Sequence, residues 1–266
     1  MIPRMVLFKG AGDLATGIAH RLWNAGFDPV MLELAKPLAV RRTVSFASAV
    51  YEKSIEVESV TAKLCPSVEM IDSYLSEKYI PVLVDPEAIT MQKLNPTILI
   101  DARMTKANDL TSKNDAELVI AIGPGFTAGV DCHVVIETER GHNLGRVIYK
   151  GKAAADTGEP GAVAGYAKER LLRAPTDGKF IPLKKIGDSV MTGEIIATVE
   201  EVPIHSAMDG IVRGMLFPEL TVSKGMKVGD IDPRGERVDF RTISDKARSL
   251  GGSVLEVILH RYFFIG

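Results

Sequence analysis

The chain is poor in the features that mark several classes of protein. It has only 2 cysteines, Cys65 and Cys132, which are too far apart for a CxxC pair and too few for a disulfide framework. We therefore expect both thiols to be reduced. No apolar run approaches the roughly 18 residues that span a bilayer, and the N-terminus lacks the apolar core and cleavage site of a secretory signal. The sequence predicts a cytoplasmic protein that does not bind membranes.

An excess of one charge is also missing. The 32 basic and 34 acidic side chains leave a formal net charge of −2, so the sequence predicts no broad positive surface for nucleic acid or anionic lipid. Small, specific ligands are the expected partners. With 266 residues, of which 46% are hydrophobic, the chain can bury a full core and form two modest domains.

The N-terminal part has the pattern of an α/β domain. The apolar run at 5–9 ends at Gly10, and apolar residues then recur at helical spacing until Gly26. A second run at 30–33 completes a βαβ unit. Later apolar runs are typical of buried parallel strands and lie at 81–84, 97–100 and 118–122. We predict a Rossmann-like parallel sheet domain over 1–173.

The composition changes after Gly161. Residues 162–173 have a helical pattern, and short β runs broken by Asp-Gly turns follow from 175. Asp177-Gly178 recurs 32 residues later as Asp209-Gly210, which indicates two copies of a small β unit that bury a shared core.

This arrangement resembles the barrel-sandwich hybrid fold of biotinyl and lipoyl domains, and we predict such a domain over 174–234. Its central hairpin, 199–204, contains no lysine, so we expect neither lipoate nor biotin. The segment 235–266 is expected to form a helix that packs on the first domain. Its aromatic tail, 262–264, is either a packed end or an interface in a homo-oligomer.

The glycine loop after the first strand suits a dinucleotide. A pyrophosphate needs close backbone approach and gains from free N–H groups at a helix start. The residues that fit this pattern are Gly10, Gly12, Ala15 and Gly17, followed by Glu33, which can accept hydrogen bonds from a ribose. The same glycines also suit an ordinary α/β corner. Asp13 is a helix cap or a neighbour of the phosphate. Arg41 and Arg42 either contact a 2′-phosphate or remain solvated.

A second group of candidate residues lies in the block 123–161. Cys132 and His133 are adjacent on a predicted strand and point to opposite faces, whereas His142 lies on a loop. No HxxxH or CxxC pair is present, so we predict no metal site. Arg140 and Arg146 suit anion recognition because guanidinium groups match phosphate geometry. A tight hairpin with surface charges is the alternative.

Taken together, the chain resembles the YqeB family, which is associated with selenium-dependent molybdenum hydroxylase systems. The matching segments are GAGDLATGIAHRL, KPLAVRRTVSFASAVYE, GPGFTAGVDCHVVIETERGHNLGRVI, DTGEPG and VGDIDPR. The resemblance implies an accessory or maturation role for a molybdenum hydroxylase client. Besides NAD(P), which the glycine loop itself suggests, it adds a molybdopterin dinucleotide as a candidate ligand of that loop.

Three hypotheses about function follow. The first is an accessory protein that binds a dinucleotide. The second is an enzyme, either an NAD(P)-dependent oxidoreductase or a sulfur or selenium transferase that uses Cys132, with His133 and His142 as further candidates. The third is a scaffold whose glycine loop stays empty.

Overall fold

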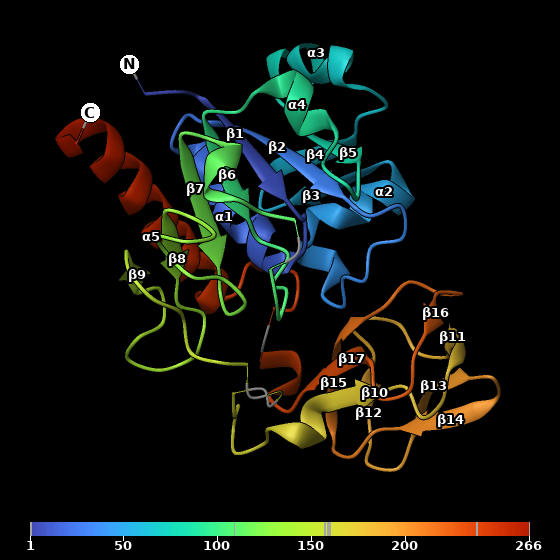
Figure 1. Cartoon of the computed structure of the whole chain (residues 1–266). Helices are drawn as coiled ribbons and strands as arrows, with labels where there is room; N and C mark the ends of the chain where they lie inside the picture. Colours follow the sequence, from blue (N-terminus) through green and yellow to red (C-terminus); the bar gives the residue numbers. More distant parts are fainter. Residues whose placement is uncertain (1, 109, 157, 159–160, 238, 266) are drawn as a thin grey trace. The chain divides into compact units, whose positions relative to one another are not determined.

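The chain folds into two units, each of which combines segments that are far apart in the sequence (Figure 1). This computed structural model describes residues 2–108, 110–156, 158, 161–237 and 239–265. The α/β unit comprises Met1–Pro37, Ser45–Asp156 and Ile243–Gly266, and the β unit comprises Leu38–Val44 and Thr157–Thr242. These limits differ from the predicted domains 1–173, 174–234 and 235–266, because residues 38–44, 157–173 and 235–242 belong to the β unit.

The α/β unit contains one nine-stranded sheet, in the order β3-β4-β5-β2-β1-β6-β7-β8-β9 (Figure 1). The strands are β1 (Met5–Lys9), β2 (Asp28–Glu33), β3 (Ser54–Val57), β4 (Val60–Leu64), β5 (Ile80–Val84), β6 (Ile98–Asp101), β7 (Leu118–Ile122), β8 (Val134–Ile136) and β9 (Val147–Ile148). The α-helices are α1 (Asp13–Asn24), α2 (Ala49–Glu52), α3 (Ile71–Ser76), α4 (Thr90–Leu94) and α5 (Asp245–His260).

The central strands form where the sequence has continuous apolar runs. The runs at 5–9 and 118–122 are β1 and β7, and those at 81–84 and 97–100 match β5 and β6 to within one residue at each end. Both faces of these strands are covered, so Leu7, Leu99 and Ile120 are fully buried. Lys9 and Asp101 end β1 and β6 as direct neighbours in the ladder.

The prediction of a parallel Rossmann-like sheet is wrong, because the sheet is mixed. Strands β4 to β8 pair in parallel, but β3 and β9 are antiparallel edge strands. The described residues between β6 and β7 contain only a short 3₁₀ turn, Lys113–Asp115, and those between β7 and β8 contain no helix. The C-terminal helix α5 packs against β8 and α1 instead.

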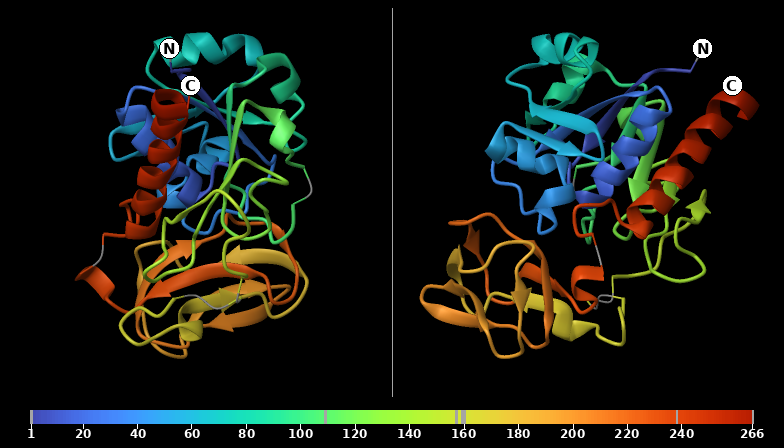
Figure 2. Two further views of the ribbon diagram at one scale, coloured as in Figure 1. Left: turned by 60° about the vertical axis from the view of Figure 1, so that its left-hand side comes forward. Right: turned by 180° about the vertical axis from the view of Figure 1, so that it is seen from behind.

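Glycine explains how closely α1 and α5 pack. A Cβ on Gly17 would lie 2.5 Å from Cβ of Ala247, and one on Gly251 would lie 2.9 Å from Cβ of Arg21. Since Gly17 faces Ala247 and Arg21 faces Gly251, the helices run in the same direction and begin at the same end of the sheet. Figure 2 shows them side by side.

The β unit contains two four-stranded antiparallel sheets, ordered β10-β17-β15-β12 and β14-β13-β11-β16. Its strands are β10 (Leu171–Arg173), β11 (Gly178–Pro182), β12 (Ser189–Val190), β13 (Ile195–Val199), β14 (Val202–His205), β15 (Gly210–Met215), β16 (Thr221–Val222) and β17 (Lys227–Asp232).

The two copies of the sequence repeat hold one another. Asp209 accepts a hydrogen bond from the Thr192 N–H at 2.7 Å, and Asp177 accepts one from the Lys224 N–H at 2.7 Å. Each aspartate thus caps a turn of the other copy. The prediction of a barrel-sandwich hybrid is nevertheless wrong, since the strands form two separate antiparallel sheets. The prediction of a helix over 162–173 is also wrong, because that range contains a 3₁₀ turn, Lys168–Arg170, followed by β10.

None of the helices in the described part of the chain is long and apolar enough to cross a bilayer.

Candidate functional site

The glycine loop after β1 already holds a carboxylate. The Ala11 N–H donates to Glu33 Oε2 at 2.8 Å, and the Leu34 N–H donates to Glu33 Oε1 at 2.7 Å. Burial raises the pKa of Glu33, although these two hydrogen bonds oppose the shift. The amide that would meet a pyrophosphate and the acidic group that would meet a ribose are therefore bonded to each other.

Three of the remaining residues of the predicted fingerprint, Gly10, Ala15 and Gly17, have packing roles. Gly10, at φ +95°, allows Arg103 to pack against the loop, where a Cβ would lie 3.3 Å from the Arg103 backbone. Ala15 is buried, and Gly17 faces α5. Gly12 is the N-cap of α1 and borders open space, while Asp13 is the first residue of that helix.

Arg41 and Arg42 belong to the β unit and contribute to its packing. Arg41 is buried, and its Nη2 donates to the carbonyl of Thr242 at 3.0 Å. The Arg42 guanidinium lies 4.5 Å from the centre of the Phe217 ring, which is a cation–π contact. The two guanidinium groups that the sequence suggested for a 2′-phosphate thus contact other residues of the β unit.

Cys132 and His133 do not form a nucleophile–base pair. Cys132 is fully buried, and burial together with the Asp131 charge raises the pKa of its thiol to about 12. His133 Nδ1 accepts a hydrogen bond from the Val119 N–H at 3.0 Å, and burial lowers the pKa of His133. The His133 imidazole is neutral, with Nδ1 accepting a main-chain hydrogen bond, and the Cys132 thiol remains protonated at neutral pH.

A buried polar network lies at the carboxyl ends of β1 and β6. Lys9 Nζ donates to Thr111 Oγ1 at 3.0 Å, and the Thr111 hydroxyl donates to Asp101 Oδ2 at 2.6 Å. Arg103 Nη2 donates to the same Asp101 oxygen at 2.7 Å. Lys9 also bonds to the Leu110 carbonyl and to Asp115. Each group is paired, so the network fixes the chain that follows β6.

One cavity, with a volume of about 600 Å³, lies between the chain segments that follow β6, β7 and β9. A Cβ on Gly125 would collide with the Thr105 carbonyl oxygen, so the glycine lets the two segments approach. The polar residues that line this larger cavity are Lys106, Asn108, Thr127, Asp131, Lys152 and Asp156. Lys106 pairs with Asp156 at 3.1 Å, and Asp131 accepts a hydrogen bond from the Thr127 N–H at 2.7 Å.

The second cavity has a volume of about 440 Å³ and shares Lys152 with the first. Its charged residues are Arg146, Lys150, Lys152 and Glu137. The Glu137 carboxylate is buried and accepts hydrogen bonds from the N–H groups of Thr138, Glu139 and Ala154 at 2.7, 2.8 and 2.7 Å. Three exposed cations therefore line this cavity together with one carboxylate that accepts three main-chain hydrogen bonds.

The two other predicted residues of this region lie on its surface. Arg140 forms a bidentate ion pair with Asp245, the first residue of α5, at 2.8 and 2.9 Å. His142 is exposed. Of the predicted anion-binding residues, Arg146 alone lines one of these two cavities.

Lys246, which the sequence reasoning missed, lies in the first turn of α5. It is half-buried, and burial followed by the nearby Arg140 charge lowers its pKa, while Asp13, Glu137 and Asp156 raise it. Glu137 lines the smaller cavity and Asp156 lines the larger one. In the sequence Lys246 resembles any surface lysine of an amphipathic helix, so no local signal marks it.

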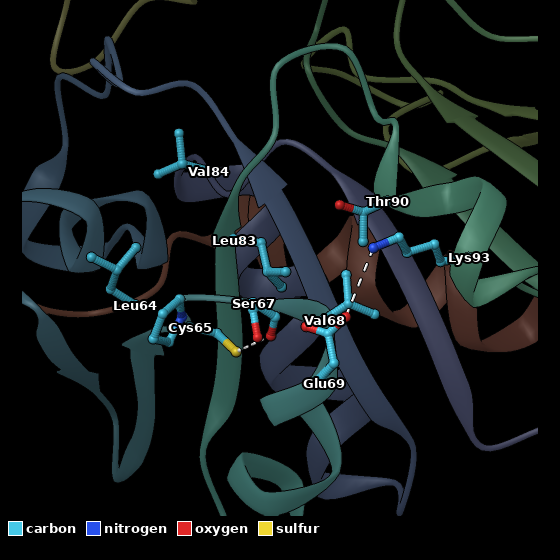
Figure 3. A pocket seen from close by; sticks show the side chains of 10 residues that line it. Leu64, Cys65, Ser67, Val68, Glu69, Leu83, Val84, Thr90 and Lys93 are labelled. Carbon is cyan, nitrogen blue, oxygen red and sulfur yellow. Dashed lines mark hydrogen bonds and ion pairs between the residues drawn. The ribbon is translucent and has the colours of Figure 1, made fainter.

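A third cavity, of about 380 Å³, lies at the carboxyl ends of β4 and β5 (Figure 3). Cys65 is one of its lining residues and donates through Sγ to the Ser67 carbonyl at 3.2 Å. Lys93 is 3.8 Å from Glu69, and Leu83 and Val68 supply apolar walls. Because Lys93, the single cation of this cavity, is paired, the cavity is less suited to an anionic ligand than the cavity lined by Arg146.

Metal binding has no structural support within the described residues, which contain no group of three or more His, Cys, Asp or Glu side chains placed to hold an ion.

Comparisons with known proteins give one close sequence relative. No family model matches the chain. The chain is 47% identical over 256 residues to the uncharacterized protein YqeB of Escherichia coli (strain K12), covering 96% of this chain and 47% of that protein. It thus spans about half the length of this relative. The resemblance to YqeB is confirmed, whereas the relative's name contains nothing about molybdenum or selenium.

Solved structures give only remote likenesses. A succinylglutamate desuccinylase/aspartoacylase from Rhodobacter sphaeroides is 16% identical, with 86% of this chain and 85% of that chain covered and a TM-score of 0.25. An aspartoacylase family protein from Mesorhizobium loti is 10% identical, with coverages of 87% and 85% and a TM-score of 0.26. At these TM-scores no activity is transferred to this chain.

The geometry of the glycine loop and the burial of Cys132 correct the predicted functions. The Ala11 amide and Glu33 are bonded to each other, which argues against the dinucleotide-binding accessory protein. The buried, protonated Cys132 argues against the sulfur or selenium transferase.

Proposed function

We propose that the α/β unit of this chain binds a small anionic ligand in the two cavities that share Lys152. The anionic group lies in the smaller cavity, against Arg146, Lys150 and Lys152. The rest of the ligand extends into the larger cavity. The observation that carries the proposal is that three cations line one cavity, whose single carboxylate is already hydrogen-bonded to the main chain.

The charge balance favours an anion in the smaller cavity. Its three cations exceed the single carboxylate, Glu137, by two charges. Three main-chain N–H dipoles point at that carboxylate, so its repulsion of a bound anion is reduced. Arg146 can form a two-pronged contact with a carboxylate or phosphate, and the lysines add point charges.

The larger cavity suits an uncharged polar group. Its lysines, Lys106 and Lys152, balance its aspartates, Asp131 and Asp156. A volume of about 600 Å³ lies within the roughly 300–1,000 Å³ range of small-molecule sites. The larger cavity also lies beyond the carboxyl ends of the parallel strands β6 and β7, where α/β sheets generally bind ligands.

Ligand-dependent stability tests this proposal. The full chain is unfolded by heat with inorganic phosphate, pyruvate, citrate, glucose 6-phosphate, NAD⁺, NADP⁺ and a molybdopterin dinucleotide, each at constant ionic strength. A ligand at 100 times its Kd adds about 2.7 kcal/mol to the free energy of unfolding. We expect at least one of these anions to raise the Tm, and glucose, the uncharged control for glucose 6-phosphate, to leave it unchanged.

Matched variants locate the site. Arg146→Ala removes a charge-assisted contact worth about 1.5–3 kcal/mol, so the affinity for the anion falls by roughly 10- to 100-fold. Lys36→Ala removes an exposed cation of the same unit that lies outside both cavities, and it leaves the affinity unchanged. Equal affinities in Arg146→Ala and Lys36→Ala would reject the proposal.

The remaining expectations stay predictions. NAD(P) or a molybdopterin dinucleotide as ligand is tested by the same titration. The link to selenium-dependent molybdenum hydroxylases is tested by capture of such an enzyme on the immobilised full chain. The homo-oligomer and the cytoplasmic location are checked by light scattering and by fractionation of the native cells.

A further inference from the structure

The chain that follows β9 joins the two cavities through main-chain hydrogen bonds on both sides of Lys152. The Ala128 N–H donates to the Gly151 carbonyl at 2.8 Å, which places Lys152 beside a turn that lines the larger cavity. Two residues further on, the Ala154 N–H donates to Glu137 Oε2 at 2.7 Å, and Glu137 lines the smaller cavity. The segment around Lys152 is therefore fixed at one end to the larger cavity and at the other end to the smaller one.

The turn at 127–131 presents an unpaired carboxylate oxygen to the larger cavity. Asp131 accepts the Thr127 N–H through Oδ2 at 2.7 Å, and the Asp131 N–H donates to the Thr127 carbonyl at 2.9 Å. Both residues line the cavity and are partly buried. Within the described part of the chain, Asp131 Oδ1 and the Thr127 hydroxyl have no hydrogen-bond or ion-pair partner. Water or a ligand must satisfy these two groups.

The other charges of the larger cavity favour hydroxyl groups over a cation as the partner of Asp131. Lys106 pairs with Asp156 at 3.1 Å, and Lys152 has no anionic partner among the described residues. A ligand ammonium at Asp131 would share the cavity with both lysine ammonium groups, and like charges repel. A hydroxyl avoids this repulsion, because it donates to the carboxylate and accepts from Lys152 or from the Thr127 hydroxyl.

We infer that the ligand of this site is a sugar or polyol that ends in a phosphate or a carboxylate. This inference rests on the proposed function, because the anionic end of the ligand contacts Arg146 in the smaller cavity. The hydroxyl groups lie in the larger cavity, where they donate to Asp131 Oδ1 and bond to the Thr127 hydroxyl. Asp131 is then the residue that selects hydroxylated ligands over other anions of the same size.

Three phosphates with the same six-carbon chain test the inference by calorimetric titration of the full chain at constant ionic strength. Sorbitol 6-phosphate has a hydroxyl on every other carbon of the chain, hexyl phosphate has none, and 6-aminohexyl phosphate has a terminal ammonium instead. We expect sorbitol 6-phosphate to bind at least about 10-fold more tightly than the other two, because its hydroxyls bond to a charged acceptor. Gluconate and hexanoate repeat the comparison with a carboxylate end, and we expect gluconate to bind more tightly.

Replacement of Asp131 by asparagine locates the preference. The asparagine oxygen can still accept the Thr127 N–H, whereas an NH₂ group takes the place of the free carboxylate oxygen. We expect Asp131→Asn to weaken sorbitol 6-phosphate about 10-fold and to leave hexyl phosphate unchanged, which also shows that the fold is intact. Asp72→Asn, the matched control, removes an exposed carboxylate of α3 outside both cavities and changes neither affinity.

Arg146→Ala separates the inference from the proposed function. We expect it to weaken all three phosphates while sorbitol 6-phosphate stays the tightest. Equal affinities of sorbitol 6-phosphate and hexyl phosphate, both reduced by Arg146→Ala, would overturn the inference and leave the proposed function intact. Tighter binding of 6-aminohexyl phosphate than of sorbitol 6-phosphate would overturn the inference in favour of a cationic group at Asp131. If none of these anions binds, the proposed function fails and the inference fails with it.

Discussion

Replacement of Gly17 by alanine tests the packing of α1 on α5. The added Cβ would lie 2.5 Å from Cβ of Ala247 and 3.0 Å from Cγ2 of Ile243. Carbon atoms in contact prefer separations of about 3.5–4.0 Å, so the helices must move apart by roughly 1 Å. The Ala247 methyl is attached to the backbone and cannot rotate away.

The expected loss of stability combines two opposing effects. Overpacking of a tight core contact costs about 1–3 kcal/mol, whereas alanine in place of glycine in a helix contributes up to about 1 kcal/mol. We expect Gly17→Ala to lower the free energy of unfolding by about 1–2 kcal/mol. At roughly 2–4 °C per kcal/mol for a unit of this size, the Tm falls by several degrees.

Chemical unfolding of the full chain, followed by far-UV circular dichroism, measures this change. Gly252→Ala is the matched control, because a Cβ at Gly252 on α5 meets nothing within 4 Å, and we expect it to stabilise the protein by about 0.5–1 kcal/mol. In the double variant, Ala247→Gly removes the methyl group that clashes with the new Cβ. We therefore expect the double variant to be more stable than the sum of the two single changes in unfolding free energy predicts. If Gly17→Ala stabilised the protein as much as Gly252→Ala does, the packing argument would fail.

Three further predictions concern single side chains. Native Cys132 resists iodoacetamide at pH 8 and reacts only after denaturant is added, because burial raises the pKa of its thiol to about 12; mass spectrometry showing fast native labelling would contradict this. Glu137→Ala leaves three main-chain N–H groups without their acceptor and lowers the free energy of unfolding by about 2–4 kcal/mol, as measured in urea; an unchanged midpoint would be inconsistent with these bonds. Although burial raises the pKa of Glu58, hydrogen bonds from the Ile243 N–H and Arg248 lower it overall, so its stabilisation is present above about pH 4.5 and is lost as the pH falls through the lowered pKa. The half-exposed Arg248 pair limits the effect of Glu58→Gln to about 1 kcal/mol at pH 7, and this difference from the unaltered chain should vanish in unfolding titrations near pH 3.

The central strands could be predicted from sequence because their signal is local. A strand buried on both faces needs a continuous apolar run, and β1 and β7 have such runs over the residues that form them. The mixed character of the sheet was not predictable in this way. The antiparallel pairing of β9 with β8 depends on how the chain folds back after residue 136, which no periodicity records.

The glycine loop illustrates a different limit. Glycine serves equally well for close approach of a phosphate, of an arginine or of a second helix, and the sequence does not distinguish among them. Gly10 faces Arg103 and Gly17 faces Ala247, both distant in sequence. The candidate site was only partly predictable for the same reason: Arg146 was recognised by its chemistry, whereas nothing in the sequence shows that Lys150 and Lys152 line the same cavity.

The most direct measurement of the central proposal is a crystal structure of the full chain soaked with tungstate, an oxyanion that anomalous scattering locates without ambiguity. The proposal predicts an anomalous peak within hydrogen-bond distance of Arg146 and Lys152, and loss of that peak in Arg146→Ala crystals. An empty cavity at Arg146, with the anion bound instead at the Gly12 end of α1, would contradict it.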